Sequence, residues 1–146
     1  LRLGLQCIHP KTADGKVRIP EWEGTFDRVL CDVPCSGLGI IRRKPELKYK
    51  PVAEFEGLPG VQYGILTACA RLVKPGGVLV YSTCTIDPTE NQQQIAAFLA
   101  RHPEFCVAEP AVAFPAGMTV TEYGALSVPT RTGMDGFFLC ALQKTR

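Results

Sequence analysis

Two short apolar runs, each followed at once by polar and small residues, are the clearest feature of the chain. Residues 26–31 and 78–81 have the length and composition of buried strands, and Asp32 ends the first of them. Between the two runs, residues 61–72 place apolar side chains at helical spacing, and Lys-Pro-Gly-Gly at 74–77 is a strong stop signal. The pattern therefore predicts a strand, a helix that ends at the stop signal, and a second strand.

The chain after the second strand predicts one more helix and two more strands. Residues 87–91 carry an N-cap candidate, a proline and an acid in the first turn, and the helix continues to about Arg101. Strand candidates follow at 105–108 and 136–142, separated by a Pro/Gly-rich excursion over 110–129. This order describes the second half of a doubly wound α/β sheet that is finished by an antiparallel hairpin.

Two segments lie outside these elements. Residues 1–5 are typical of the tail of a helix, and a short apolar segment near Cys7 and Ile8 leads into a polar turn. Residues 37–60 form a basic, Pro-rich segment, and this segment is long for a structureless connection in a compact domain. Long loops of this kind are usually functional or disordered.

Composition narrows the class of protein without pointing to a partner. A chain of 146 residues with 46% apolar residues is expected to form one soluble domain with a real core. The net charge is only +2, so any surface for nucleic acid has to be local. No apolar run approaches the roughly 20 residues of a membrane span, and the first residues lack the layout of a signal peptide. No membrane partner is expected.

The seven cysteines predict free thiols. Their number is odd, Cys31 and Cys35 form the one close pair, and neither a Cys-x-x-Cys motif nor a His-Cys cluster of zinc spacing occurs. We therefore expect reduced thiols in a cytoplasmic protein and no metal site. A lone cysteine after a core strand is most often a small buried apolar residue. This is the expectation for five of the seven: Cys7, Cys31, Cys69, Cys106 and Cys140.

Cys35 and Cys84 differ from the other five because each follows directly on a predicted strand. Cys35 lies in Asp-Val-Pro-Cys-Ser-Gly at 32–37, and Cys84 lies in Tyr-Ser-Thr-Cys-Thr at 81–85. In an open parallel sheet, ligands bind just beyond the carboxyl ends of the strands. Both thiols are therefore expected at one edge of the sheet, which points to thiolate chemistry.

The spacing and setting of these motifs resemble those of the S-adenosylmethionine-dependent RNA methyltransferases that modify carbon 5 of cytosine. The resemblance spans about residues 1–142, and the loop after the first cysteine is most similar to the bacterial branch that methylates small-subunit ribosomal RNA, the Sun/Fmu or methyltransferase B type. It implies an α/β, Rossmann-like class I methyltransferase sheet. Besides the two cysteine motifs, the matching segments are Ile-Arg-Arg-Lys-Pro-Glu at 41–46, Lys-Pro-Gly-Gly at 74–77, Pro-x-Glu-Asn at 88–91 and Asp-Gly-Phe-Phe at 135–138.

The resemblance assigns roles to the residues of the two cysteine motifs. Carbon 5 of cytosine is a poor nucleophile, so a thiolate first adds to carbon 6, and the resemblance gives this attack to Cys84. It gives Cys35 a part in releasing the methylated base. Asp32 would contact the cofactor, S-adenosylmethionine, and the cytosine edge, where a raised pKa would suit it; an Asx-type cap of its own loop is the alternative. Further cofactor contacts are expected from Pro34 and Asp14, although an Asp-Gly pair is also an ordinary turn.

A basic run follows the first cysteine motif and is the expected contact to RNA. Arg42, Arg43, Lys44 and Lys48 would clamp phosphates beside the catalytic edge, with a strong dependence on salt; a solvated charge cluster is the alternative. A thiolate reaches carbon 6 only when the cytosine is unstacked. The expected partner is therefore ribosomal RNA with a single-stranded or flipped cytosine, and transfer RNA stays open as the substrate.

The chain departs from the family pattern at the cofactor site. The glycine-rich turn after the first strand and the acidic residue after the second, which hold the cofactor in the family, do not occur here. We therefore expect residues 1–146 to be the C-terminal part of a catalytic domain, truncated at its N-terminus, with the missing strands and any RNA-binding domain upstream. Such a fragment would bind the cofactor weakly and turn over poorly.

Three other functions fit parts of the sequence. Amino-group and DNA cytosine methyltransferases carry a related motif where Cys35 stands, and the DNA enzymes use that thiol as the nucleophile, but neither needs Cys84. A non-catalytic RNA-binding module would not need a Cys84 of low pKa. A Cys-His hydrolase would need a histidine near one thiol, and His9 and His102 are expected at surface or turn positions away from the sheet edge.

Overall fold

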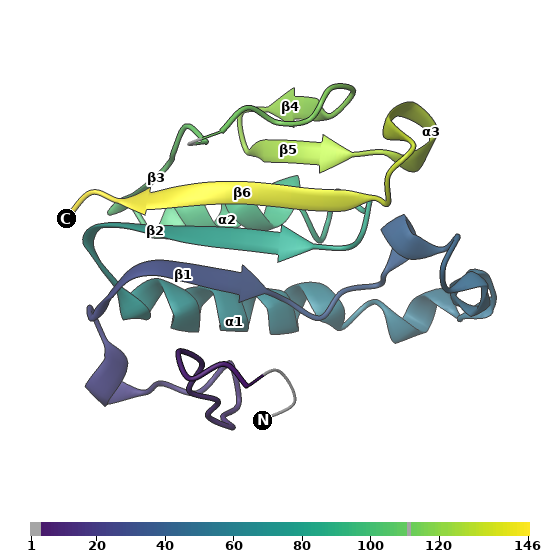
Figure 1. Cartoon of the computed structure of the whole chain (residues 1–146). Coiled ribbons are helices and arrows are strands. Elements are labelled where there is room, and N and C mark those ends of the chain that lie inside the picture. Colours follow the sequence, from purple (N-terminus) through teal and green to yellow (C-terminus); the bar gives the residue numbers. More distant parts are fainter. Residues whose placement is uncertain (1–3, 111) are drawn as a thin grey trace.

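Six strands form one mixed sheet within residues 4–110 and 112–146, the part of the chain that this computed structural model describes (Figure 1). The strands span Phe26–Asp32 (β1), Val73–Thr83 (β2), Phe105–Val107 (β3), Thr119–Thr121 (β4), Gly124–Ser127 (β5) and Phe137–Lys144 (β6). Their order in the sheet is β1-β2-β6-β5-β4, and β3 also pairs with β6. β1 and β2 are parallel, whereas β6 runs antiparallel to β2, β3 and β5.

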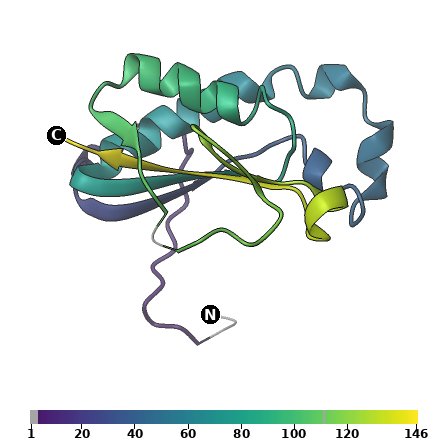
Figure 2. The ribbon, with the colours of Figure 1, turned by 90° about the horizontal axis from the view of Figure 1, so that it is seen from above.

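Two helices cover one face of the sheet, and Figure 2 shows both on the same side. α1 (Leu58–Leu72) connects β1 to β2, and α2 (Gln92–Arg101) follows β2. A short helix, α3 (Pro129–Thr132), precedes β6. The described residues also contain four 3-10 turns, at Pro20–Trp22, Leu38–Ile40, Pro45–Tyr49 and Val52–Glu54.

The core lies between the sheet and these two helices. Alternate residues of each strand point toward the helices, and residues four apart on α1, such as Leu66 and Ala70, point back. The largest strand contributions come from Tyr81 and Phe138, whose rings meet edge to face at 6.3 Å. The buried cluster also includes Cys31, Val73, Leu79, Ile95, Phe98, Cys140 and Leu142.

The opposite face of the sheet carries apolar side chains that no helix of the described residues covers. Leu30 of β1 is 69% exposed, and Val78, Val80 and Leu139 line a shallow cavity of about 700 Å³ on this face. Parallel strands of α/β proteins are normally covered on both faces. The described residues therefore form a sheet with one face packed against helices and a second face without helices, the bare face.

The central elements lie where the sequence predicts them, with one boundary displaced. α1 ends at Leu72, as the stop signal requires, but β2 begins at once at Val73 and includes residues 74–77. The pairing of β1 with β2 skips from Val73 to Val78, so these four residues bulge out of the ladder. Gly76, at φ +77°, supplies the left-handed backbone of the bulge.

The end of the sheet is more elaborate than the predicted hairpin. The expected pairing of 105–108 with 136–142 is confirmed only in part, because β3 pairs with the last residues of β6, up to Lys144. The first residues of β6 pair instead with β5, which forms its own hairpin with β4 inside the Pro/Gly-rich excursion. These two strands have only three and four residues, so their alternation was too short to show in the sequence.

The N-terminal segment has less structure than its pattern predicts. The helix tail expected at 1–5 falls partly outside the described residues, and residues 4 and 5 are not helical. Cys7 and Ile8 belong to no strand and are exposed. The loop at 37–60, by contrast, is built from 3-10 turns and is not structureless. Within the part of the chain described, no helix combines the length and the apolar character that a membrane span needs.

Candidate active site

The two cysteine motifs meet at one edge of the sheet, as predicted. Because β1 and β2 are neighbouring parallel strands, the loops that follow Asp32 and Thr83 leave the sheet side by side. Cys35 Sγ lies 3.2 Å from Cys84 Sγ, and the backbone N–H of Cys84 donates to Cys35 Sγ at 3.3 Å. Both cysteines are half-buried, so they pack against each other while remaining open to a ligand.

The environment of Cys35 keeps its thiol protonated. Burial is the main cause, followed by the hydrogen bond with Cys84, and together they raise the pKa of Cys35 to about 12. At neutral pH the S–H group of Cys35 can therefore donate a hydrogen bond to the sulfur of Cys84.

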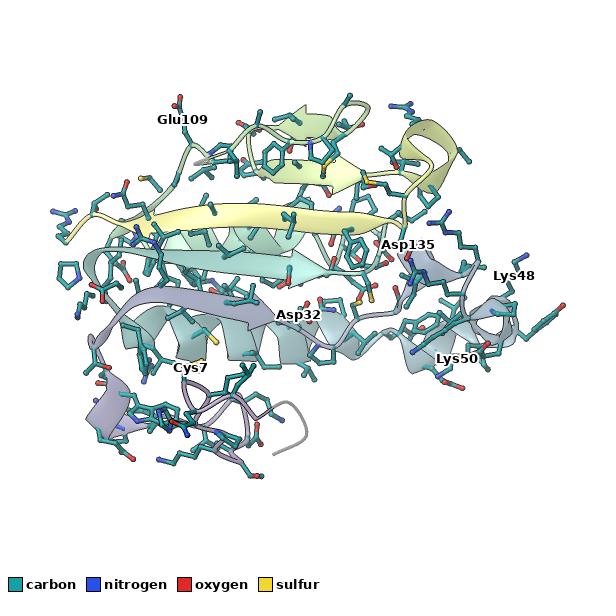
Figure 3. The ribbon with its side chains drawn as sticks, viewed as in Figure 1. Cys7, Asp32, Lys48, Lys50, Glu109 and Asp135 are labelled. Carbon is teal, nitrogen blue, oxygen red and sulfur yellow. The ribbon has the colours of Figure 1, made fainter. Side chains whose placement is uncertain are left out.

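Asp32 lies at the carboxyl end of β1, where Figure 3 labels it. Its Oδ1 accepts a hydrogen bond of 2.7 Å from Ser82 Oγ, which is its partner in the β1–β2 register. Among the described residues no hydrogen bond joins its side chain to its own loop, so the Asx-type cap is not observed. Asp32 and Pro34 are both exposed, and a carboxylate with one oxygen still open suits a cationic amine or the amino edge of a base.

Backbone contacts join the two cysteine loops to the turn before β6. The N–H of Gly39 donates to Cys84 O at 3.0 Å, and the N–H of Gly136 donates to Gly39 O at 2.8 Å. A Cβ atom at Gly39 would overlap the carbonyl oxygen of Gly136 and would lie 2.8 Å from Cys84 O. Only glycine fits this crossing point.

Three buried polar side chains lie near the thiols, and the sequence pattern did not predict a place in the site for any of them. Gln62, Glu90 and Asn91 are at most 2% exposed, and each forms hydrogen bonds with a residue next to Cys35 or Cys84. The acid of the Pro-x-Glu-Asn motif was interpreted as a helix-start residue. One feature of the sequence could have indicated this buried polar cluster. Gln62 lies four positions before Leu66, so it is a polar residue on the apolar, buried face of α1.

The basic run is tied to the body of the protein at one point. Arg42 Nε and Arg43 Nε lie 2.5 Å from the two carboxylate oxygens of Asp135, which is buried. Two guanidinium groups on one carboxylate leave a net charge of one positive unit. Lys44 and Lys48 are exposed, and Figure 3 shows Lys48 and Asp135 at the same end of the molecule. The phosphate clamp stays a prediction, carried mainly by the two lysines.

Asp14 lies in an exposed turn against α1. Its Oδ1 accepts a hydrogen bond of 2.9 Å from the backbone N–H of Lys16, and a Cβ atom on Gly15 would contact Ile65. No hydrogen bond among the described residues joins Asp14 to Asp32. Its contact with the cofactor stays a prediction.

The remaining cysteines and histidines are structural or exposed. Cys31 and Cys140 are buried and Cys69 is half-buried, but the prediction was wrong for Cys7 and Cys106, which are exposed. Cys7 belongs to no strand, and Cys106 lies on the short strand β3.

His102 does not lie near the thiols. His102 stacks on Phe98, with ring centroids 4.2 Å apart, just after the end of α2. A ten-residue helix separates His102 from the turn after Cys84, a span of about 15 Å. In the described chain no histidine forms a hydrogen bond with either thiol, and no group of three metal-ligating residues occurs. This arrangement does not support a Cys-His hydrolase.

Comparison with known proteins identifies one family. Residues 1–143 match the family described as 16S rRNA methyltransferase RsmB/F. The chain is 44% identical, over 98% of its length, to a Bacillus subtilis (strain 168) protein named "Probable ribosomal RNA small subunit methyltransferase B", of which it covers 33%.

Two solved structures have the same fold. The crystal structure of PH0851 is 35% identical, with a TM-score of 0.86 over 98% of this chain and 32% of that one. The crystal structure of NSun6 from Pyrococcus horikoshii with SFG is 27% identical, with a TM-score of 0.66 over 80% of this chain and 29% of that one. The chain therefore spans about a third of the length of the relatives that it matches.

Proposed function

Because this chain belongs to the 16S rRNA methyltransferase RsmB/F family, we propose that the whole protein transfers a methyl group from S-adenosylmethionine to carbon 5 of a cytosine in ribosomal RNA. The observation that carries the proposal is the pair of thiols, Cys35 and Cys84, 3.2 Å apart beside Asp32 at the carboxyl ends of two parallel strands. Two adjacent thiols suit a reaction in which a covalent bond to the base must be made and later broken.

The first step is the attack of Cys84 on carbon 6 of the cytosine. Cys84 Sγ, which lies 3.2 Å from Cys35 Sγ at the edge of the sheet, adds to carbon 6. The carboxylate of Asp32 accepts a hydrogen bond from the amino group of the same base and so orients carbon 6 toward Cys84 Sγ. The electron pair of the former double bond between carbons 5 and 6 moves onto carbon 5. Carbon 5 becomes nucleophilic as a result.

S-adenosylmethionine supplies the methyl group. The exposed carboxylate of Asp32 and the exposed ring of Pro34 fit the amine and the apolar part of such a cofactor, and NSun6 was solved with SFG, an analogue of S-adenosylmethionine. Asp14 would contact the adenosine half. The described residues supply only this part of a cofactor site.

In the release step, solvent water takes the proton of carbon 5, the double bond between carbons 5 and 6 forms again, and Cys84 leaves carbon 6 as a thiolate. Cys35 acts here because its S–H group is within hydrogen-bond distance of the departing sulfur. Both thiols must stay reduced for this chemistry, so we propose the cytoplasm as the location.

Exposed lysines and an unstacked base complete the proposed contact with RNA. Lys44 and Lys48, with the net positive charge around Asp135, would hold phosphates next to the thiols. The target cytosine must be single-stranded or flipped out of its stack.

A denaturing gel of the whole protein with small-subunit ribosomal RNA and S-adenosylmethionine tests this function. In the Cys35→Ala protein, Cys84 still attacks but release stalls, so a band of covalently bound RNA is expected. The Cys35→Ala/Cys84→Ala protein should give no such band.

Four outcomes would contradict the proposal. A band in a Cys84→Ala protein that the double variant lacks would make Cys35 the nucleophile, as in DNA cytosine methyltransferases. No band in either variant, with methyl transfer intact in the wild type, would mean a different target atom. Binding of RNA without any methyl transfer by the wild type would favour a non-catalytic module, and a band with transfer RNA alone would change the substrate.

A further inference from the structure

Polar side chains from elsewhere in the fold hold the two thiols in place. The β1–β2 ladder ends at the Asp32–Ser82 pair, so Cys35 and Cys84 both lie beyond the paired backbone of these strands. The 3.2 Å between their sulfur atoms therefore depends on contacts made by the loops themselves. The residues on either side of each cysteine make these contacts.

Gln62 and Glu90 hold the backbone on both sides of Cys35. Gln62 Nε2 donates to Pro34 O at 2.9 Å, and the backbone N–H of Ser36 donates to Glu90 Oε2 at 3.0 Å. Gln62 Nε2 also donates to Glu90 Oε2 at 2.6 Å, so the two side chains act as one unit.

Asn91 holds both neighbours of Cys84. Thr83 Oγ1 donates to Asn91 Oδ1 at 2.6 Å, and Asn91 Nδ2 donates to Thr85 O at 3.0 Å. One amide thus contacts the residue before and the residue after the thiol. The hydroxyl groups of Ser36 and Thr85, 2.7 Å apart, then join the two loops.

Glu90 and Asn91 are adjacent residues in the turn before α2, and the turn is itself fixed. Tyr81 Oη donates to Glu90 O at 2.7 Å, which ties the turn to β2. Glu90 is 2% exposed, and among the described residues its Oε1 has no hydrogen-bond partner. Burial of a carboxyl group with one oxygen unpaired is costly, so packing alone does not explain this residue.

We propose that Glu90 and Asn91 are positioning residues of the active site: Glu90, together with Gln62, sets the position of Cys35, and Asn91 sets the position of Cys84. The consequences rest on the proposed function, in which Cys84 makes the bond to RNA and Cys35 assists its release. Displacement of Cys35 should stall release, whereas displacement of Cys84 should slow attack. The two adjacent residues therefore have opposite effects on the amount of trapped RNA.

Turnover and trapped RNA in the whole protein separate these effects. Glu90→Leu should lower turnover about tenfold or more, because small displacements of reacting groups are costly, and should accumulate covalent RNA as Cys35→Ala does. Asn91→Leu should lower turnover similarly without accumulating RNA. KM for RNA should not change in either variant. Glu90→Gln retains an acceptor oxygen for Ser36 and Gln62 and should restore turnover.

Two further variants separate positioning from a general loss of structure. Gln62→Leu removes the donor to Pro34 O and should act in the same direction as Glu90→Leu. Gln94→Leu is the matched control, because Gln94 is also a buried amide near this turn, and among the described residues its side chain bonds only to Thr89 O. The turnover of this variant should stay at the wild-type value. Equal losses in Gln94→Leu and Glu90→Leu would overturn the proposal.

A second measurement does not depend on activity. Diamide oxidises two adjacent thiols to a disulfide and is itself reduced to the hydrazine, so the rate of Cys35–Cys84 disulfide formation reports on their separation. Peptide mass spectrometry should show slower formation in Glu90→Leu and Asn91→Leu, and the wild-type rate in Glu90→Gln and Gln94→Leu. Wild-type rates in all four variants would overturn the positioning proposal. Failure of Cys35→Ala to trap RNA, with the slower disulfide rates still observed, would overturn only the proposed function.

Discussion

Gly39 is the residue at which three parts of the active site touch. It contacts Cys84 O and Gly136 through backbone hydrogen bonds, and it has no room for a side chain. We expect Gly39→Ala to cost about 1–3 kcal/mol in the free energy of unfolding, the usual cost of overpacking. Turnover should fall more steeply than stability, because Cys84 moves with its carbonyl group.

Urea unfolding and a methyl-transfer assay would check this, with Gly57→Ala as the control. A Cβ atom at Gly57 meets nothing within 4 Å, and its φ of −79° suits alanine. That variant should be as stable as the wild type or slightly more stable. A Gly39→Ala protein with wild-type stability and turnover would show that the crossing point is looser than the structure indicates.

Because some thiols are buried, the free energy of unfolding should fall as the pH becomes alkaline. Burial raises the pKa of Cys140 to about 12, from an ordinary value of 9.0. Between these two pH values the folded protein keeps the proton that the unfolded chain has lost. This contribution to stability is therefore fully present below about pH 9 and is lost as the pH rises toward 12.

The urea midpoint should fall between pH 8 and pH 10.5, since each pH unit above about 9 costs about 1.4 kcal/mol per buried thiol. Cys140→Ala removes one such thiol, so its loss over the same interval should be smaller than that of the wild type. Cys7→Ala, which changes an exposed cysteine, should lose as much as the wild type. An identical loss in the Cys140→Ala protein would contradict the interpretation.

At the scale of elements, Asp135 joins the basic run to the turn before β6. Its carboxylate occupies the Nε groups of both Arg42 and Arg43. Asp135→Asn removes the negative charge and frees two guanidinium groups for phosphate. In the whole protein, the slope of log K for RNA against log salt should steepen by about one unit, and the free energy of unfolding should fall. Lys48→Ala should make the slope shallower by a similar amount.

Filter binding over a series of salt concentrations measures both slopes. Lys11→Ala is a suitable control, since Lys11 lies outside the basic run and pairs with Glu21; its slope should match that of the wild type. An unchanged slope in Asp135→Asn and Lys48→Ala would remove this end of the molecule from the RNA contact.

The order of elements, and with it the meeting of the two thiols, could be predicted from local pattern. The apolar runs end at Cys31 and at Tyr81, and parallel neighbours bring such ends to one edge. The contacts that hold the thiols could not be predicted in this way. Glu90 and Ser36 are 54 residues apart, and the acid already had a local explanation as a helix-start residue. When neighbouring residues already explain an acidic residue, the sequence does not indicate that it also bonds to a residue far along the chain.

The role of the arginines shows the same limit. The contact of Arg42 and Arg43 with phosphates stays a prediction. Their partner within the protein, Asp135, is 93 residues from Arg42, and its burial could not be predicted from the Asp-Gly-Phe-Phe motif. The short strands β4 and β5 were missed for another reason, because their pairing depends on β6 and not on their own alternation.

At the scale of the whole molecule, the bare face of the sheet is where the isolated chain and the whole protein should behave differently. Leu30 is 69% exposed here, and the chain spans about a third of the length of its relatives. The isolated 146-residue chain should therefore bind the dye ANS and associate through this face. Leu30→Glu should reduce both effects while leaving the urea midpoint of the chain nearly unchanged, because an exposed side chain loses little on substitution.

The same substitution in the whole protein tests whether this face is covered there. If it is, Leu30→Glu places a carboxylate in an apolar contact and should cost several times more stability than in the isolated chain. Val52→Glu is the matched control, since Val52 is 76% exposed on a 3-10 turn away from the sheet, and it should have little effect in either protein. Equal, small effects of Leu30→Glu in both proteins would mean that this face stays open to solvent in the whole protein.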